Sequence, residues 1–128
     1  MLDRAPIVGF LFTTDYARAR AFYEGILGFR VESQDAFALV IRAGGTRVRI
    51  SRVPDFQPVQ GTVLGWEVPD VPNAARWLRE RGVETEKYPF VEDSDLGVWR
   101  APGGAEVAWF KDPDGNVLSL SNTGAGQA

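Results

Sequence analysis

The sequence contains no cysteine and no histidine, and these two absences exclude several kinds of chemistry. Without cysteine the chain has no disulfide, no thiolate nucleophile and no zinc site built from sulfur ligands. Without histidine it has no serine–histidine–aspartate triad and no imidazole ligand for a metal ion. The side chains left for binding or catalysis are carboxylates, hydroxyls, amides, cations and aromatic rings.

Long hydrophobic runs and an excess of basic residues are also missing. The apolar run at residues 7–12 is about half as long as the core of a secretory signal, and Asp3 precedes it. The 128 residues include 14 Lys plus Arg and 17 Asp plus Glu, which gives a net charge of −3. The basic residues are scattered and form no patch of the kind that nucleic acid requires. We therefore expect a cytoplasmic protein with no nucleic-acid partner and no association with membranes.

The residues that are present predict a mixed fold of strands and helices. Hydrophobic residues make up 45% and charged residues 24%, as in ordinary globular domains. Residues 7–13 have apolar side chains at both odd and even positions, which predicts a strand buried on both faces. Asp15 is expected to cap a helix over residues 16–27 that Gly28 ends. Three further strands are predicted at residues 29–32, 36–42 and 46–52, with a hairpin turn at Gly44 and Gly45.

The same order of elements begins again after residues 53–61, which contain two prolines and have no period. A shift of 55 residues carries Asp15 onto Asp70, and a shift of 54 carries Gly28 onto Gly82, so one βαβββ unit is used twice. The second copy is predicted to contain a helix at 71–81, strands at 62–68, 84–88, 106–111 and 117–121, and a turn at 112–115. We expect one domain over residues 1–128, with modules 6–52 and 62–121, a linker at 53–61 and a C-terminal tail at 122–128, of which residues 123–128 fray.

Three groups of residues occur in the order and spacing of one known superfamily. They lie at 13–19 with 22–23 and 27–29, at 67–71 with 78 and 81–83, and at 109–116. They resemble the vicinal oxygen chelate superfamily, which includes glyoxalase I, bleomycin resistance proteins, fosfomycin resistance proteins and extradiol dioxygenases. The resemblance covers nearly the whole chain. It implies an α+β fold of two βαβββ modules forming a curled mixed β-sheet cup, usually within a homodimer.

The resemblance also locates the four strand positions that hold a divalent metal in the enzymes of this superfamily. These positions fall on Val8, Arg49, Val63 and Ser119. Valine has no donor atom, arginine adds positive charge, and one serine hydroxyl is a poor ligand for a divalent ion. We therefore expect no metal site, no cofactor, and none of the superfamily's metal-dependent reactions.

The resemblance implies that the cup is a pocket for a small organic ligand. The parity of the strands predicts further residues that line it. Residues two apart in a strand share a face, so Phe10 and Phe12 are expected beside Val8. The expected lining is apolar and aromatic with few polar groups, as in small-molecule pockets. The candidate ligand-binding residues are Val8, Phe10, Phe12, Arg49, Val63, Trp99 and Ser119.

Individual residues keep alternative interpretations. Arg49 is interpreted as a group that binds a carboxylate or phosphate, as the ion-pair partner of Glu67, or as a side chain at a dimer seam. Glu67 is interpreted as a general base, provided that burial raises its pKa, or as half of a structural ion pair. Trp66 and Trp77 are assigned to the core, whereas Trp99 is assigned to the ligand.

The acidic turn at residues 112–115 is interpreted as a tight Asp-Pro-Asp-Gly turn, with a calcium site as the alternative. For the whole chain, three functions follow. The first is a metal-independent protein that sequesters an apolar or aromatic ligand, as bleomycin resistance proteins do. The second is a metal-free lyase or isomerase that uses Arg49 or Glu67, and the third is an accessory module whose cup is vestigial.

Overall fold

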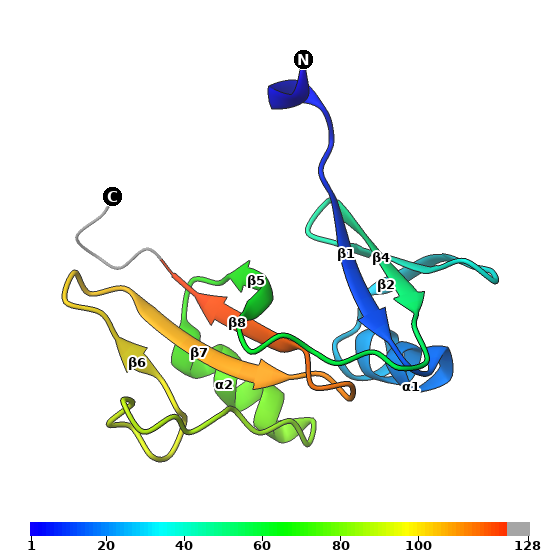
Figure 1. The fold of residues 1–128 in the computed structure, drawn as a ribbon. Coiled ribbons are helices and arrows are strands. Elements are labelled where there is room, and N and C mark those ends of the chain that lie inside the picture. Colours follow the sequence, from blue (N-terminus) through cyan, green and yellow to red (C-terminus); the bar gives the residue numbers. More distant parts are fainter. Residues whose placement is uncertain (123–128) are drawn as a thin grey trace. The chain divides into compact units, whose positions relative to one another are not determined.

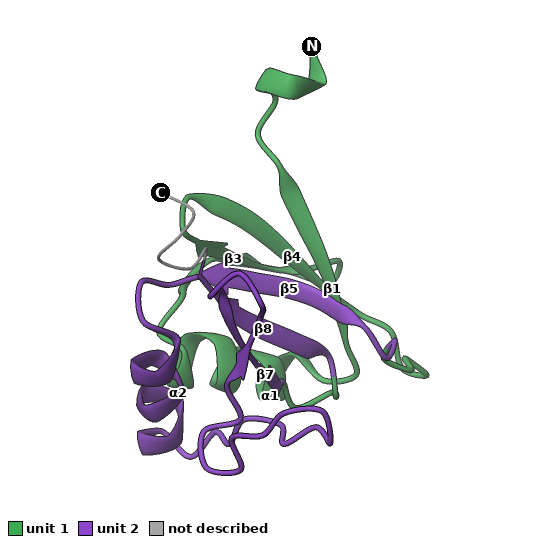
Figure 2. Ribbon diagram, turned by 90° about the vertical axis from the view of Figure 1, so that its left-hand side faces the viewer, with its two compact units in different colours: residues 1–58, 112–115 green, residues 59–111, 116–128 purple. Residues whose placement is uncertain are grey.

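The computed structural model describes residues 1–122, and the predicted fraying of residues 123–128 lies outside the described residues. It confirms the α+β class, with two four-stranded sheets of mixed direction. The chain divides into two compact units (Figures 1 and 2). Unit 1 contains Met1–Pro58 and Asp112–Gly115, and unit 2 contains Val59–Lys111 and the chain from Asn116 onward.

Unit 1 is built on a sheet with the strand order β1-β4-β3-β2. β1 runs parallel to β4, and the other neighbouring strands are antiparallel. Its elements are the 3-10 helix η1 (Leu2–Arg4), β1 (Val8–Thr13), α1 (Tyr16–Arg20), the π-helix η2 (Ala21–Ile26), β2 (Arg30–Gln34), β3 (Leu39–Ala43) and β4 (Thr46–Arg52). Gly44 and Gly45 form the predicted β3–β4 turn with φ of 55° and 81°, angles that glycine adopts without steric cost.

The first helix differs from the uniform helix predicted over residues 16–27. It begins as expected, because the Asp15 side chain accepts a hydrogen bond from the Arg18 backbone N–H. After α1 it continues as the π-helix η2, where the wider turn places the adjacent residues Phe22 and Tyr23 both in the core. Their rings meet edge to face at 5.1 Å. Gly28 then ends the helix at φ 81°, as predicted.

The prediction that the first strand is buried on both faces is wrong. In β1, Leu11 and Thr13 are buried at 3% and 1% exposure, but Phe10 is 62% exposed. One face of this strand is covered by its own unit, and the other remains open although it is apolar. An apolar sequence alone does not reveal which of its faces the chain covers.

Unit 2 repeats the arrangement with the strand order β5-β8-β7-β6. Its elements are β5 (Thr62–Glu67), α2 (Val71–Glu80), β6 (Trp99–Arg100), β7 (Glu106–Lys111) and β8 (Val117–Ser121). Asp70 caps α2 by accepting a hydrogen bond from the Asn73 backbone N–H, and Gly82 follows the helix at φ 82°. The core of this unit lies between α2 and one face of the sheet, and contains Ala75, Leu78, Ala108, Phe110, Leu118 and Leu120.

The strand predicted at residues 84–88 does not form, and β6 lies instead at Trp99–Arg100. One backbone hydrogen bond, from Glu86 N–H to the Trp109 carbonyl at 2.7 Å, still ties this segment to β7. The buried Thr85 hydroxyl donates to the carbonyl of Leu96 at 2.6 Å. Residues 83–86 therefore alternate between buried and more exposed positions, as in a strand, although they lie in an irregular loop.

The acidic turn at residues 112–115 belongs to unit 1, although the strands on both sides of it belong to unit 2. The Asp114 carboxylate accepts hydrogen bonds from Thr13, Thr14 and Arg18. The Asp112 carboxylate accepts one from the buried Tyr23 hydroxyl at 2.7 Å. The turn itself is tight, with Gly115 at φ 88° and its N–H donating to the Asp112 carbonyl. The tight-turn interpretation therefore describes its backbone, and both carboxylates accept hydrogen bonds from side chains of unit 1.

Between residues 1 and 122, no helix has the length and the apolar character that crossing a membrane requires.

Candidate functional site

The open face of the unit 1 sheet is apolar along β1 and cationic along β4. Val8, Phe10 and Phe12 lie on this face with exposed fractions of 39%, 62% and 42%. In the parallel register with β4, Phe10 lies opposite Arg49 and Phe12 lies opposite Ser51. Parity thus places the three apolar candidates of β1 and the Arg49 side chain on one surface, where rings and a guanidinium can contact the same ligand.

Arg49 differs from the other arginines of this face in its electrostatic surroundings. Arg42 and Arg47 both donate to the carboxylate of Glu32, with Nε to oxygen distances of 3.1 and 2.7 Å. Hydrogen bonds from Arg47 and Arg42 lower the pKa of Glu32, so this carboxylate stays ionised between them. Within unit 1 as described, no carboxylate lies within ion-pair distance of Arg49. The pKa of Asp35 is lowered mainly by hydrogen bonds from the Phe37 and Ala38 backbone N–H groups, and the positive charge of Arg49 adds to this effect from a distance.

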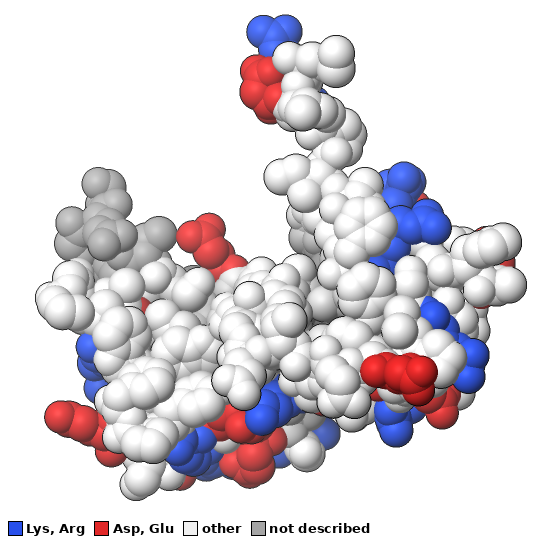
Figure 3. Space-filling model, in the orientation of Figure 1, with Lys and Arg blue, Asp and Glu red and all other residues white. Residues whose placement is uncertain are grey.

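Aromatic contact extends this face beyond the strand. The ring of Phe56, which lies in the segment after β4, is 5.6 Å from the ring of Phe12 and tilted by 49°. In Figure 3 the part of the surface over β1 and β4 shows uncharged side chains bordered by blue basic ones. The face therefore combines exposed rings with a cationic margin, which suits a flat apolar molecule that carries negative charge.

The other candidate residues lie on the open face of the unit 2 sheet. In the β7–β8 register Ser119 lies opposite Trp109, and in the β6–β7 register Trp99 lies opposite Val107. Ser119 also lies opposite Gly65, and a Cβ added at Gly65 would clash with the Ser119 hydroxyl oxygen. Glycine at position 65 therefore leaves the space that this hydroxyl occupies.

Two candidates on β5 have exposed side chains. Val63 is 40% exposed and lies at a register shift between Thr62 and Leu64, where the ladder with β8 is irregular. Glu67 is exposed at the end of β5, opposite Ser121. The general-base interpretation of Glu67 requires a buried carboxylate, and this side chain is not buried.

The tryptophans divide differently from the sequence prediction. Trp66 stacks on the buried Phe110 at 6.1 Å, as expected of a residue that faces the core. The assignment of Trp77 to the core is wrong, because this ring is 38% exposed and lies under the guanidinium of Arg81 at 3.8 Å. A helix of period 3.6 has a border between its buried and exposed sides, and Trp77 lies on that border.

Sequence reasoning missed an aromatic cluster around Trp99. Its members are Tyr88, Phe90, Trp99 and Trp109, whose ring centroids lie 5.6 to 6.4 Å apart in the contacting pairs. The parity of β7 could have found Trp109, since Val107, Trp109 and Lys111 alternate with the core residues Ala108 and Phe110. Tyr88 and Phe90 lie in the irregular loop, where no period marks their direction.

The residues at the four positions that the resemblance links to a metal do not suit a divalent ion. Val8 and Val63 supply no donor atom, Arg49 supplies a cation, and Ser119 supplies one hydroxyl. Across the described part of the chain, no three acidic residues come close enough together to hold a metal ion.

Comparisons with known proteins agree with this architecture. The family model described as "Glyoxalase/Bleomycin resistance protein/Dioxygenase superfamily" matches residues 5–120. No protein with a curated description matches the chain. Among solved structures, a glyoxalase/bleomycin resistance protein/dioxygenase from Alicyclobacillus acidocaldarius is 15% identical over 93% of this chain and 91% of its own, with a TM-score of 0.73.

Two other solved structures show the same fold. A glyoxalase family protein from Enterococcus faecalis is 21% identical over 94% of this chain and 99% of its own, with a TM-score of 0.71. A glyoxalase/bleomycin resistance protein/dioxygenase from Nocardioides is 19% identical over 97% and 89%, with a TM-score of 0.70. At these identities the likeness concerns the fold and not the ligand.

Proposed function

Since the chain belongs to the glyoxalase/bleomycin resistance protein/dioxygenase superfamily, we propose that it is a metal-independent member that binds and sequesters a small apolar or aromatic ligand bearing a negative charge. The observation that carries this proposal is the pairing of Phe10 with Arg49 on the open face of unit 1. An exposed ring and a guanidinium without a carboxylate partner in its unit lie side by side on adjacent strands. The ring supplies apolar contact, and the planar guanidinium offers two parallel hydrogen bonds to a carboxylate or phosphate.

Burial energetics support a ligand at this position. A Phe side chain that is 62% exposed leaves apolar surface in contact with water, and covering such surface contributes roughly 25 cal/mol per Å². A ligand ring laid on Phe10 and Phe12 would recover part of this free energy. Its anionic group would at the same time pair with the Arg49 guanidinium. It would not have to displace a carboxylate of unit 1, because none is paired with Arg49.

A thermal-shift screen of aromatic carboxylates and aryl phosphates tests the proposal. A compound at a hundred times its dissociation constant should stabilise the native state by roughly 2.7 kcal/mol, which raises Tm by about 10 °C for a domain of this size. Arg49→Gln should reduce the shift given by an anionic compound and leave the shift given by its neutral amide unchanged. Arg52→Gln is the matched control, because it removes the same charge from the same strand at an exposed position outside the Phe10 face.

Two outcomes would overturn the proposal. One is a screen in which no anionic aromatic compound raises Tm. The other is an equal loss of the shift in Arg49→Gln and in Arg52→Gln, which would show that only net charge matters. Val63→Trp tests separately the candidate ligand-binding residues of unit 2. A large ring at this exposed position of β5 should block a ligand that covers the open face of the unit 2 sheet.

A further inference from the structure

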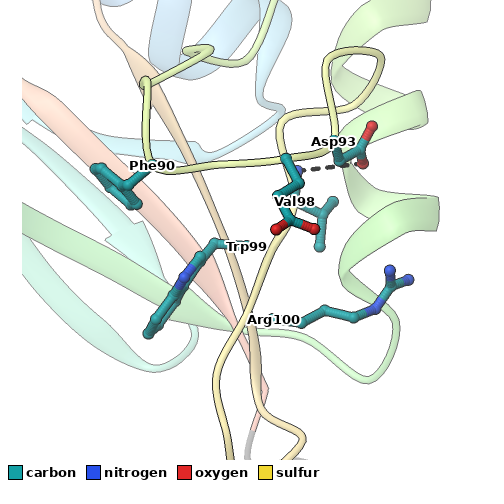
Figure 4. A pocket seen from close by; sticks show the side chains of 6 residues that line it. Phe90, Asp93, Val98, Trp99 and Arg100 are labelled. Carbon is teal, nitrogen blue, oxygen red and sulfur yellow. Dashed lines mark hydrogen bonds between the residues drawn. The ribbon is translucent and has the colours of Figure 1, made fainter.

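Unit 2 contains a pocket that the proposed function does not use. Its volume is about 230 Å³, and it is lined by Phe90, Glu92, Asp93, Val98, Trp99 and Arg100. All six residues lie in the loop before β6 or in β6 itself. In Figure 4 the rings of Phe90 and Trp99 lie on one side of the pocket, and the side chains of Asp93 and Arg100 lie on the other. The pocket therefore has an aromatic wall and a charged wall.

The aromatic wall is held in place by the rings behind it. Phe90 stacks on Tyr88 with an interplanar angle of 8° and a centroid distance of 5.6 Å. It meets Trp99 at 83° and Trp109 at 79°. Phe90 nevertheless remains 59% exposed. Perpendicular rings with exposed surface are the arrangement that surrounds an organic cation in cation–π recognition.

The charged wall has a surplus of negative charge. Arg100 is already engaged, because its Nε donates to the Glu106 carboxylate at 3.0 Å. Glu92 is exposed and makes no ion pair among the residues that the structure describes. Although burial alone raises the pKa of Asp93, hydrogen bonds from the backbone N–H groups of Leu96, Asp95 and Val98 lower it, so this carboxyl stays ionised.

The same hydrogen bonds fix the geometry of the charged wall. The Asp93 carboxylate accepts from the N–H groups of Asp95 at 3.0 Å, Leu96 at 3.1 Å and Val98 at 3.4 Å, the last drawn as a dashed line in Figure 4. Gly97 has φ of +69°, and a Cβ there would lie 2.7 Å from the Glu86 carbonyl oxygen. The loop thus passes close to the segment around Glu86. Because the Asp93 carboxylate is already held by hydrogen bonds, binding a ligand costs little additional conformational entropy.

The charge of the whole unit points the same way. Residues 59–111 and 116–128 contain nine acidic and six basic side chains, whereas the residues of unit 1 contain eight of each. The net negative charge of the chain therefore belongs to unit 2. A field of this sign raises the local concentration of cations near the pocket.

We propose that this pocket binds a small organic cation, a quaternary ammonium or a protonated alkylamine, between the Phe90 and Trp99 rings and the Glu92 and Asp93 carboxylates. This site is independent of the anion site proposed for the Phe10 face of unit 1. It uses other residues, the opposite ligand charge and a different unit of the chain.

The test compares choline with 3,3-dimethylbutan-1-ol, its neutral isostere. All four tryptophans lie in unit 2, so binding is followed by tryptophan fluorescence and checked by calorimetry. Choline should bind saturably and about tenfold more tightly than the neutral alcohol, the size expected of a partly desolvated cation–π contact. Equal binding of the two compounds, or no saturable binding of choline, would overturn the proposal.

Variants test the two walls separately. Glu92→Gln should weaken choline binding about threefold to tenfold, whereas Glu80→Gln, the same change at an exposed position of α2, should not. Arg100→Gln should strengthen choline binding, because it removes a competing cation from the pocket. A weaker binding in Arg100→Gln, or an equal loss in Glu92→Gln and Glu80→Gln, would contradict a cation site.

Trp99→Leu removes one ring of the aromatic wall and should abolish the preference for choline over the neutral alcohol. Because Trp99 also packs on Trp109 at 6.4 Å, its thermal unfolding is measured beside the binding. If Trp99→Leu does not fold, the glutamate and arginine variants still decide the question. A folded Trp99→Leu that keeps the full preference would show that the ring does not contact the cation.

Discussion

Thr14 donates two hydrogen bonds to one carboxylate oxygen of Asp114, which lies a hundred positions away in the sequence. The Thr14 backbone N–H donates to Asp114 Oδ1 at 2.9 Å, and the Thr14 hydroxyl donates to the same atom at 2.8 Å. Arg18 donates to this oxygen as well, at 3.0 Å, and Thr13 donates to the other one. The Asp114 side chain is only 2% exposed. The turn between β7 and β8 is thus fastened to the start of the first helix by one buried, saturated carboxylate.

Replacing this carboxylate should destabilise the protein strongly. Asp114→Ala leaves the Thr13 and Thr14 donors without their acceptor, and removing a charged acceptor from a buried network costs roughly 3 kcal/mol. Chemical unfolding of the full chain measures the loss. Asp55→Ala, a change at an exposed aspartate of the segment after β4, should change the free energy of unfolding by less than about 0.5 kcal/mol. Equal effects of the two variants would contradict the structural role of Asp114.

The same group predicts an acid dependence of stability. Burial alone raises the pKa of Asp114, but hydrogen bonds from Thr13, Thr14 and Arg18 outweigh it and lower the pKa below its ordinary value. A carboxyl whose pKa is lower in the folded state stabilises that state above its unfolded pKa, near 3.9, and this contribution disappears as pH falls through the folded pKa. Stability measured from pH 6 to pH 2 should therefore fall less steeply below pH 4 in Asp114→Asn than in the natural sequence.

Local patterns explain which parts of the structure could be predicted. Gly44 and Gly45 supply the positive φ that a short hairpin needs, and strand parity together with the superfamily resemblance assigns Phe10 and Arg49 to one face. The hydrogen bonds of Asp114 were not predictable, because they join residues that no local pattern relates. β6 was misplaced for a different reason. The alternation at residues 83–86 is typical of a strand, but the Thr85 hydroxyl finds its acceptor inside the loop.

The buried hydroxyl of Tyr23 gives a second stability prediction. It donates to the Asp112 carboxylate at 2.7 Å, and the Tyr23 ring is 1% exposed. Tyr23→Phe keeps the ring and removes a buried donor to a charged acceptor, which should lower the free energy of unfolding by roughly 1.5–3 kcal/mol. Tyr16→Phe should cost less, because the Tyr16 hydroxyl accepts its bond from the Arg52 N–H at a partly exposed position. A larger loss in Tyr16→Phe would contradict this ranking.

Metal analysis provides an independent test of the donor set. Val8, Arg49, Val63 and Ser119 give the superfamily's metal positions no suitable ligands. The purified protein, dialysed against chelator and then against buffer, should therefore carry far less than one zinc, nickel, manganese or iron per chain by elemental analysis. Adding Zn²⁺ or Mn²⁺ should not raise Tm. About one retained ion per chain would refute the metal-independent function.

The edge strand β1 of unit 1 favours a homodimer. β1 is an edge strand of its sheet, and it is preceded by Ile7, whose side chain is 76% exposed. An apolar edge strand of this kind invites pairing with another chain, and natural proteins usually cover it. We therefore expect two copies to associate through the β1 edge. Light scattering at micromolar concentration should give about twice the chain mass of 14.1 kDa.

Charge at the edge should separate the two copies. Ile7→Glu places a negative charge in both chains at the expected contact, so the dimer should dissociate at a protein concentration at least about tenfold higher than in the natural sequence. Leu2→Glu is the matched control, because Leu2 is 82% exposed but lies in η1, outside β1. A mass near 14.1 kDa for the natural sequence would refute the dimer. Equal dissociation of Ile7→Glu and Leu2→Glu would instead show that the contact lies away from β1.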